Sequence, residues 1–153
     1  MFEVITYNPA DVFLNIAGYN CVGWNEISIE RKSKNFKPIK GIRGKSTRVR
    51  DKDTGAVVNI SLLQVSPTND VLSQIAQEDL ELGTGRIDLL LVDKSGNSVF
   101  KSSEAYIDGY PKVSYKDSVE TTVWTFECQS TDTYFVGGNA RPNNALLDLL
   151  GNI

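Results

Sequence analysis

The side chains that could do chemistry in this sequence are few. The chain has 153 residues, no histidine, and only two cysteines, Cys21 and Cys128. Without histidine there is no Ser-His-Asp or Cys-His catalysis, and two cysteines alone cannot complete a tetrahedral metal site. Lysine and carboxylate chemistry remains, but no spacing selects an acid–base pair. We therefore expect no catalytic residue, no metal, no cofactor and no enzymatic activity, and we interpret both cysteines as small buried residues.

One segment resembles a phosphate-binding loop at first sight. Gly41-Ile42-Arg43-Gly44-Lys45-Ser46 ends in the required Gly-Lys-Ser. The motif needs four residues between its glycines and a helix directly after it, whereas only two residues intervene here and Thr47–Arg50 has no helical pattern. The nucleotide-binding interpretation therefore fails.

Charge is distributed very unevenly along the chain. The segment from 31 to 50 has no acidic residue and nine basic ones, namely Arg31, Lys32, Lys34, Lys37, Lys40, Arg43, Lys45, Arg48 and Arg50. The rest of the chain holds seven basic against nineteen acidic residues, a net charge of −12. Because the basic segment is broken by Pro38, Gly41 and Gly44 and has few apolar residues, we expect an extended hairpin tip or a mobile loop over about 31–56.

Three interpretations of this basic segment remain open on composition alone. It could be a solvated loop, a patch that neutralises nucleic-acid phosphates, or a self-assembly contact with the acidic surface of a neighbouring copy. The segment contains one aromatic residue, Phe36, and so offers no base-stacking platform.

Hydrophobic periodicity predicts a mainly β fold. Alternating patterns predict about seven strands, at 12–16, 21–30, 57–65, 86–92, 98–107, 113–115 and 119–129. One amphipathic helix is expected, with Ser66 as N-cap, Pro67 at its first position and Gly83 as its left-handed end. A short leucine-rich helix is expected at 145–150. The class is α+β, a β-sandwich or barrel with one packed helix, in a single domain 1–153 with an N-terminal arm 1–10 and a C-terminal segment 132–153.

The sequence shows no targeting or membrane signal. The first nine residues lack a basic region followed by an apolar one, and the longest apolar run is Leu89–Val92. We expect the protein to stay in the cytosol in which it is made, without a membrane partner.

The order of these features resembles that of phage tail tube proteins. The arm carries Tyr7-x-Pro9-x-x-Val12, a strand pair leads into the glycine-broken basic hairpin, the Ser66-Pro67 helix follows, and Asp108-Gly109-Tyr110-Pro111 precedes the last strands. The resemblance covers essentially the whole chain. The tube subunit of type VI secretion systems is similar to the same family.

The resemblance implies a structural subunit of a contractile phage tail. Six copies would form a closed β-barrel ring, rings would stack into a tube, and DNA would pass through the lumen during ejection without specific binding. The nine basic residues would contact the neighbouring ring, and Thr121, Thr125 and Glu127 would face the lumen. Sheath, baseplate and tail terminator proteins would be its partners, in a virion assembled in the host cytoplasm. A type VI secretion-like tube subunit and a nucleic-acid-binding β-barrel are the alternatives.

Overall fold

The computed structural model describes residues 7–138. In this range the chain forms a short 3-10 turn, ten strands and one α-helix. They are η1 (Pro9–Asp11), β1 (Val12–Ile16), β2 (Tyr19–Asn20), β3 (Trp24–Arg31), β4 (Phe36–Lys40), β5 (Ser46–Arg50), β6 (Ala56–Leu63), α1 (Thr68–Leu82), β7 (Ile87–Asp93), β8 (Val99–Ile107), β9 (Thr121–Cys128) and β10 (Thr133–Phe135).

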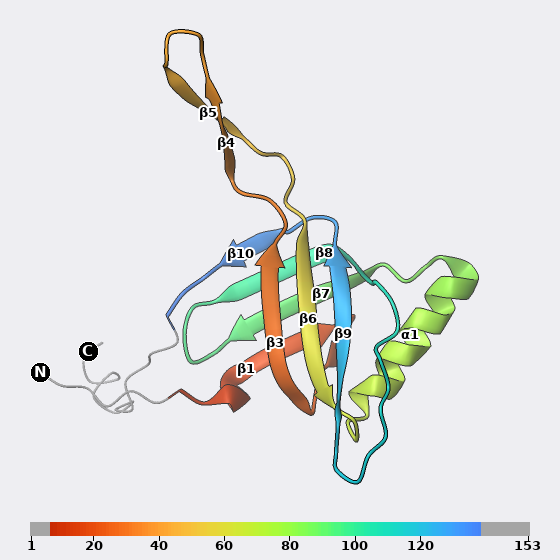
Figure 1. Ribbon diagram of the computed structural model, residues 1–153. Helices are drawn as coiled ribbons and strands as arrows, with labels where there is room; N and C mark the ends of the chain where they lie inside the picture. Colours follow the sequence, from red (N-terminus) through yellow and green to blue (C-terminus); the bar gives the residue numbers. More distant parts are fainter. Residues whose placement is uncertain (1–6, 139–153) are drawn as a thin grey trace, which may run out of the picture.

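Eight of these strands form one antiparallel sheet that bends back on itself. The strand order is β2-β1-β7-β8-β9-β6-β3, with β10 also paired to β8. β8 pairs with β9 only from Ala105–Cys128 to Ile107–Phe126, and its first residues pair with β10 instead. The sheet therefore becomes a sandwich in which β3, β6 and β9 cross the layer of β1, β7, β8 and β10 (Figure 1). The predicted mainly β, α+β class is confirmed.

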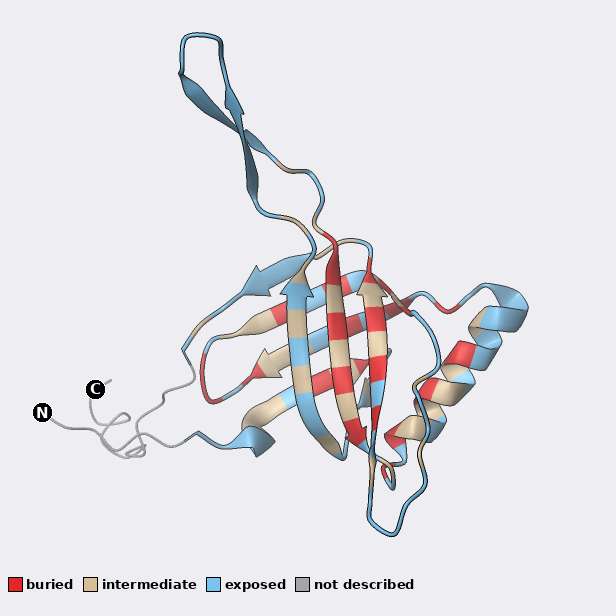
Figure 2. Ribbon diagram, in the orientation of Figure 1, coloured by how far each residue is buried: buried red, intermediate tan, exposed pale blue. Residues whose placement is uncertain are grey.

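The core lies between the two layers. Along β6 and β9 every second side chain is buried, which Figure 2 shows as alternating bands. Trp124, Phe126 and Cys128 share the buried face of β9, as the alternation predicts, and Phe100 packs from the opposite layer. Both cysteines are free and buried. Burial raises the pKa of the Cys21 thiol to about 11 and also raises the pKa of Cys128, so both are held in the unreactive thiol form at neutral pH.

Helix α1 closes one side of the sandwich, next to β9 (Figure 1). It starts at Thr68, one residue later than predicted, although Pro67 already has helical backbone angles. Ser66 still caps the helix, because its Oγ accepts a hydrogen bond from the Thr68 amide at 3.2 Å. The predicted end is confirmed: Gly83 has a φ of 67°, and its amide bonds back to the carbonyl of Asp79.

Asn69 joins the first turn of the helix to the sheet. Its Oδ1 accepts hydrogen bonds from the indole Nε1 of Trp124 at 3.0 Å and from the Thr122 hydroxyl at 2.7 Å. Its Nδ2 donates to the carbonyls of Leu63 and Ser66. An indole N–H can only donate, so the amide must present its oxygen to Trp124.

Removing this amide is expected to be costly for stability. Asn69→Ala leaves the buried indole N–H of Trp124 without an acceptor, so we expect the free energy of unfolding to fall by about 2–3 kcal/mol, measured by urea denaturation. Gln74→Ala, on the exposed face of the same helix, should change it by less than about 0.5 kcal/mol. Equal effects of the two substitutions would show that the Asn69 hydrogen bonds contribute little.

Further sequence predictions differ from the structure within residues 7–138: the strand expected at 57–65 is observed as Ala56–Leu63, and two larger differences concern whole strands. The strand expected at 113–115 is wrong: this stretch has no strand partner, because Pro111 interrupts the chain and Val113 and Tyr115 are exposed. Strand β10 was not expected, since its exposed residues show no buried alternation. The helix expected at 145–150 lies outside the described residues. In the described part, no helix is long and apolar enough to cross a membrane.

Candidate assembly surfaces

No chemical centre forms in the described part of the chain. In residues 7–138, no three His, Cys, Asp or Glu side chains gather closely enough to hold a metal ion. Of the carboxylates, Glu120 pairs with Lys116 at 3.6 Å and Glu127 pairs with Lys32. Four surfaces are more informative: a projecting hairpin, a polar sheet face, a cleft at the side of the sandwich and a groove at its end.

The basic hairpin, residues 36–50, projects from the sandwich as a separate two-stranded sheet of β4 and β5 (Figure 1). Every residue of both strands is exposed. The predicted extended hairpin is therefore observed. An isolated two-stranded hairpin is marginally stable at best. We therefore expect a packing partner to stabilise this one.

The two faces of the basic hairpin differ in character. Residues paired across the strands share a face, and Phe36 with Arg50, Pro38 with Arg48 and Lys40 with Ser46 form one of them. There the Arg48 guanidinium lies 4.1 Å from the centre of the Phe36 ring. The only aromatic ring of the hairpin is thus covered by a cation, which weakens the base-stacking interpretation.

The opposite face of the hairpin is partly apolar. It carries Ile39 and Val49, both exposed, and Ile42 in the connecting turn is fully exposed. A count of charges along the chain does not reveal this apolar face. The signal that could have revealed it was the strand register, which brings Ile39 and Val49 to the same side.

The nine basic residues fall into different settings. At the root of the hairpin, Arg31 Nη2 donates to the carbonyl of Asp53 at 3.2 Å, and Lys32 pairs with Glu127, which raises the pKa of Lys32. Lys37 Nζ lies 3.6 Å from the carboxylate of Asp51. The Lys32–Glu127 pair ties the root to β9, and the Lys37–Asp51 pair joins the two segments at the base of the hairpin.

The cations nearest the end of the hairpin have no such partner. Lys40, Arg43 and Lys45 lie on and beside the turn, and no ion pair in residues 7–138 involves them. Lys34 lies in the segment between β3 and β4, at the root, and Arg48 and Arg50 lie on β5. The structure therefore separates tip cations from root cations, which the sequence treated as one set.

The outward face of β3, β6 and β9, here called the polar sheet face, brings the predicted lumen residues together. Thr125 lies opposite Asn59 and donates a hydrogen bond to it at 2.8 Å, and Asn59 lies opposite Ser28 of β3. Thr121 and Glu127 point to the same side of β9. The full set within these strands is Glu26, Ser28, Glu30, Val57, Asn59, Ser61, Leu63, Thr121, Val123, Thr125 and Glu127.

This face carries three glutamates and no basic residue within its strands. Lys32 follows β3 and neutralises Glu127, which leaves Glu26 and Glu30 unpaired by any described ion pair. The sequence placed Glu26 and Glu30 on one side of their strand but could not show that β3 and β9 share a face. The formal charge of the polar sheet face is therefore negative.

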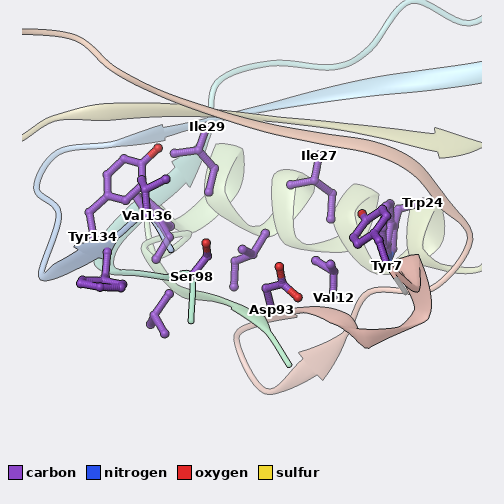
Figure 3. Close-up of a pocket in the computed structure, with 13 residues that line it drawn as sticks. Tyr7, Val12, Trp24, Ile27, Ile29, Asp93, Ser98, Tyr134 and Val136 are labelled. Carbon is purple, nitrogen blue, oxygen red and sulfur yellow. The ribbon is translucent and has the colours of Figure 1, made fainter. Parts of the chain in front are cut away.

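The side cleft lies between β3 and the opposite layer, on the side of the sandwich away from α1. β3 is the last strand in the sheet order, so its outer edge has no strand partner within residues 7–138. Ile27 and Ile29 point from β3 into a space of about 280 Å³, which Tyr134 and Val136 border at one end (Figure 3). The side chains of Ile27 and Ile29 are therefore only half buried.

The end groove lies at the opposite end of β3 from the hairpin. It has a volume of about 420 Å³ and is lined by η1, the start of β1 and the segment that leads into β3, with Pro9, Phe13, Cys21, Val22 and Trp24 among its residues. Phe13 and Val22 are exposed. β3 spans eight residues between this groove and the root of the hairpin, so the two features mark opposite ends of the molecule.

A curved sandwich closed by one helix, with a projecting hairpin, is the fold of contractile injection system tube proteins. The chain superposes on the sheath–tube complex of PVC, an extracellular contractile injection system, in its extended state, with a TM-score of 0.58, 8% identity, and coverage of 85% of this chain and 93% of that one. The tube-terminating cap of the anti-feeding prophage gives a TM-score of 0.60 at 11% identity, covering 88% and 97%. These likenesses establish the fold.

Sequence similarity gives the family. The chain is 31% identical over 156 residues to "Structural protein ORF10" of Pseudomonas phage KPP10, covering 95% of this chain and 90% of the relative. No protein-family model matches. The chain belongs to the family of this phage structural protein. Its sequence relative is thus a phage structural protein, and its fold is shared with chains of contractile injection systems.

Proposed function

We propose that this protein assembles into hexameric rings that stack into the inner tube of a contractile phage tail, a conduit for DNA ejection, and that it has no enzymatic activity. The observation that carries the proposal is that two surfaces of a single copy, the side cleft and the basic hairpin, lack a packing partner among the described residues. The cleft leaves Ile27 and Ile29 half buried beside a strand edge that is unpaired within residues 7–138, and all strand residues of the hairpin are exposed among the described residues.

Lateral assembly would complete the first of these surfaces. An open edge such as that of β3 is a template for pairing with another chain, and closing a ring of copies removes every such edge. In a cyclic ring each copy uses two different surfaces, so the β3 edge and side cleft of one copy meet another part of its neighbour. The number six follows from the tail tube resemblance.

Axial assembly would use the hairpin. Its unpaired tip cations, Lys40, Arg43 and Lys45, extend away from the body, and the residues outside 31–50 carry a net charge of −12. A basic tip meeting an acidic neighbour fixes orientation and speeds encounter. In this proposal Arg31 and Lys32 belong to the root, while the tip residues make the contact between rings.

The polar sheet face would line the lumen, with Thr121, Thr125 and Glu127 exposed to passing DNA. Hydroxyl and amide groups keep the wall wet, and Glu26 and Glu30 repel phosphate, so DNA slides without binding. α1 would then face outward, towards a sheath. A sheath partner is supported by the PVC relative, which is part of a sheath–tube complex; baseplate and terminator proteins would bind the two ends of the tube. The mature location is the virion.

A second role is supported by one specific observation. The cap that terminates the anti-feeding prophage tube shares this fold at a TM-score of 0.60, so the chain could instead form a single ring that ends a tube. A terminator stops at one ring, whereas a tube subunit stacks without limit. The same distinction holds for a type VI secretion-like tube, which would also stack but belongs to a cell-anchored injector.

Electron microscopy of the purified protein tests the proposal directly. We expect negatively stained samples at rising protein concentration to show rings with a central hole and then hollow rods. Single rings that never stack would favour the terminator role. Protein that stays monomeric under all ionic conditions, and is absent from isolated tails, would refute the assembly altogether.

A further inference from the structure

We propose that Ile42, at the tip of the basic hairpin, inserts into the end groove of a second copy in the next ring. The inference rests on the proposed function and adds to it the partner and the site of the hairpin. The contact is apolar at its centre, formed by Ile42 on one copy and by Phe13, Val22 and Trp24 on the other, and the tip cations surround it.

The donor side of this contact is visible in the hairpin. Ile42 is the most exposed large hydrophobic side chain in residues 7–138, at 106% relative exposure. It lies in a turn between two glycines, Gly41 and Gly44, where a polar residue would be the ordinary choice. Ile39 and Val49 continue the apolar surface down one face of the hairpin. A row of exposed apolar side chains on an unsupported hairpin indicates a docking surface.

The acceptor side is a shallow groove lined mainly by apolar residues, and its backbone is held in place. The backbone on either side of Val22 is fixed by hydrogen bonds: the Val22 amide donates to Thr68 Oγ1 at 3.0 Å, and its carbonyl accepts from the Ser66 hydroxyl at 2.5 Å. The Val22 side chain remains 45% exposed on the groove. A groove whose walls are anchored to the helix N-terminus is already formed before any partner arrives.

One carboxylate adjoins the groove. Asp11 lies between two of its lining residues, Ala10 and Val12, and takes part in no described ion pair. Lys40, Arg43 and Lys45 flank Ile42. One cation, Lys94, lies on the groove side, 4.5 Å above the Phe13 ring, so the groove is less acidic at that wall. The Asp11 carboxylate suits a cation of an incoming tip.

The position of the two surfaces indicates that the occupant is another copy of this chain. Hairpin and groove lie at opposite ends of β3 (Figure 1), so a tip cannot reach the groove of its own copy. A contact between two different surfaces of identical chains is heterologous: it closes into a ring where the rotation allows and otherwise extends as an open-ended series. Stacked rings need a contact of this type.

Cysteine cross-linking tests the contact. All variants carry Cys21→Ala, which removes the native thiol from the groove lining. In assembled rods, I42C combined with V22C should form disulfides between rings under mild oxidation. Because each copy has one donor and one acceptor position, a non-reducing gel should show a ladder well beyond the dimer.

A matched pair makes the result specific. Val65 is 73% exposed near the same end of the sandwich but does not line the groove, so I42C with V65C should give at least tenfold less cross-linked product, as should I42C alone. Rods in which V65C cross-links and V22C does not would overturn the groove as the site while leaving the tube proposal intact. Failure of the unsubstituted protein to form any rings or rods would overturn both proposals.

Discussion

Exchanging Lys40, Arg43 and Lys45 for glutamate is expected to leave the sandwich folded and to abolish rod formation. The three side chains are at the exposed tip of the hairpin and take part in no described ion pair, so the free energy of unfolding should change by less than about 0.5 kcal/mol per site. The substitutions change the charge of each tip by six units. A tip that meets an acidic neighbour then faces like charge, which costs several kcal/mol per contact.

The measurements are circular dichroism with urea denaturation for the fold, and sedimentation with electron microscopy for assembly. The matched control keeps the charge and changes the shape: K40R, R43K and K45R together should still form rods. High salt should partly restore rods in the charge-reversed variant, because exposed charges are screened beyond about 8 Å at physiological ionic strength. Rods of normal length from the charge-reversed variant at low salt would show that the tip charges do not contribute to stacking.

The elements that could be predicted from the sequence are those whose signals are local. The helix has a proline near its start, an apolar stripe and a glycine in the left-handed conformation at its end, and each of these acts within one turn of chain. The strand Val119–Gln129 was predicted from alternation, and Trp124, Phe126 and Cys128 do lie on its buried side. The basic hairpin was predicted for the same reason, since its turn residues and its run of basic residues are local properties.

The surfaces could not be predicted because they depend on pairing between distant segments. Ser28, Asn59 and Thr125 come from three separate strands and form one row only through the register of the sheet. The side cleft exists because β3 ends the sheet and β8 changes partner from β10 to β9. Neither the position of β3 at the end of the sheet nor the change of partner along β8 produces a hydrophobic pattern in the sequence.

The hairpin shows the same limit at a smaller scale. Composition identified the cations of this segment but treated them as one set. In the structure Arg31, Lys32 and Lys37 have partners near the root, and the tip cations have no described ion pair. Only the pairing of β4 with β5 shows that Ile39 and Val49 share one face. A charge count therefore predicts an electrostatic contact and overlooks the apolar one beside it.

A second large effect is expected when the charge of the polar sheet face is reversed, and it concerns DNA binding. Replacing Glu26 and Glu30 with lysine should leave folding and rod formation intact, because both side chains are exposed on the outward face of β3. The exchange changes this face by four charge units in every copy. If the face lines the lumen, a wall that repelled phosphate then attracts it, and neutralising each phosphate contact releases counterions, so binding falls steeply with salt.

We expect the variant rods, but not unsubstituted rods, to retain short duplex DNA at low salt in a form protected from nuclease. Protection is the informative measurement, because any added lysine attracts DNA to the outside of a rod, where nuclease can still cut it. The matched control is Glu78→Lys with Glu81→Lys, which adds the same charge to the exposed surface of α1. That variant should bind DNA without protecting it. Bound DNA that remains fully sensitive to nuclease in the β3 variant would place the polar sheet face on the exterior of the tube and assign the lumen to another surface.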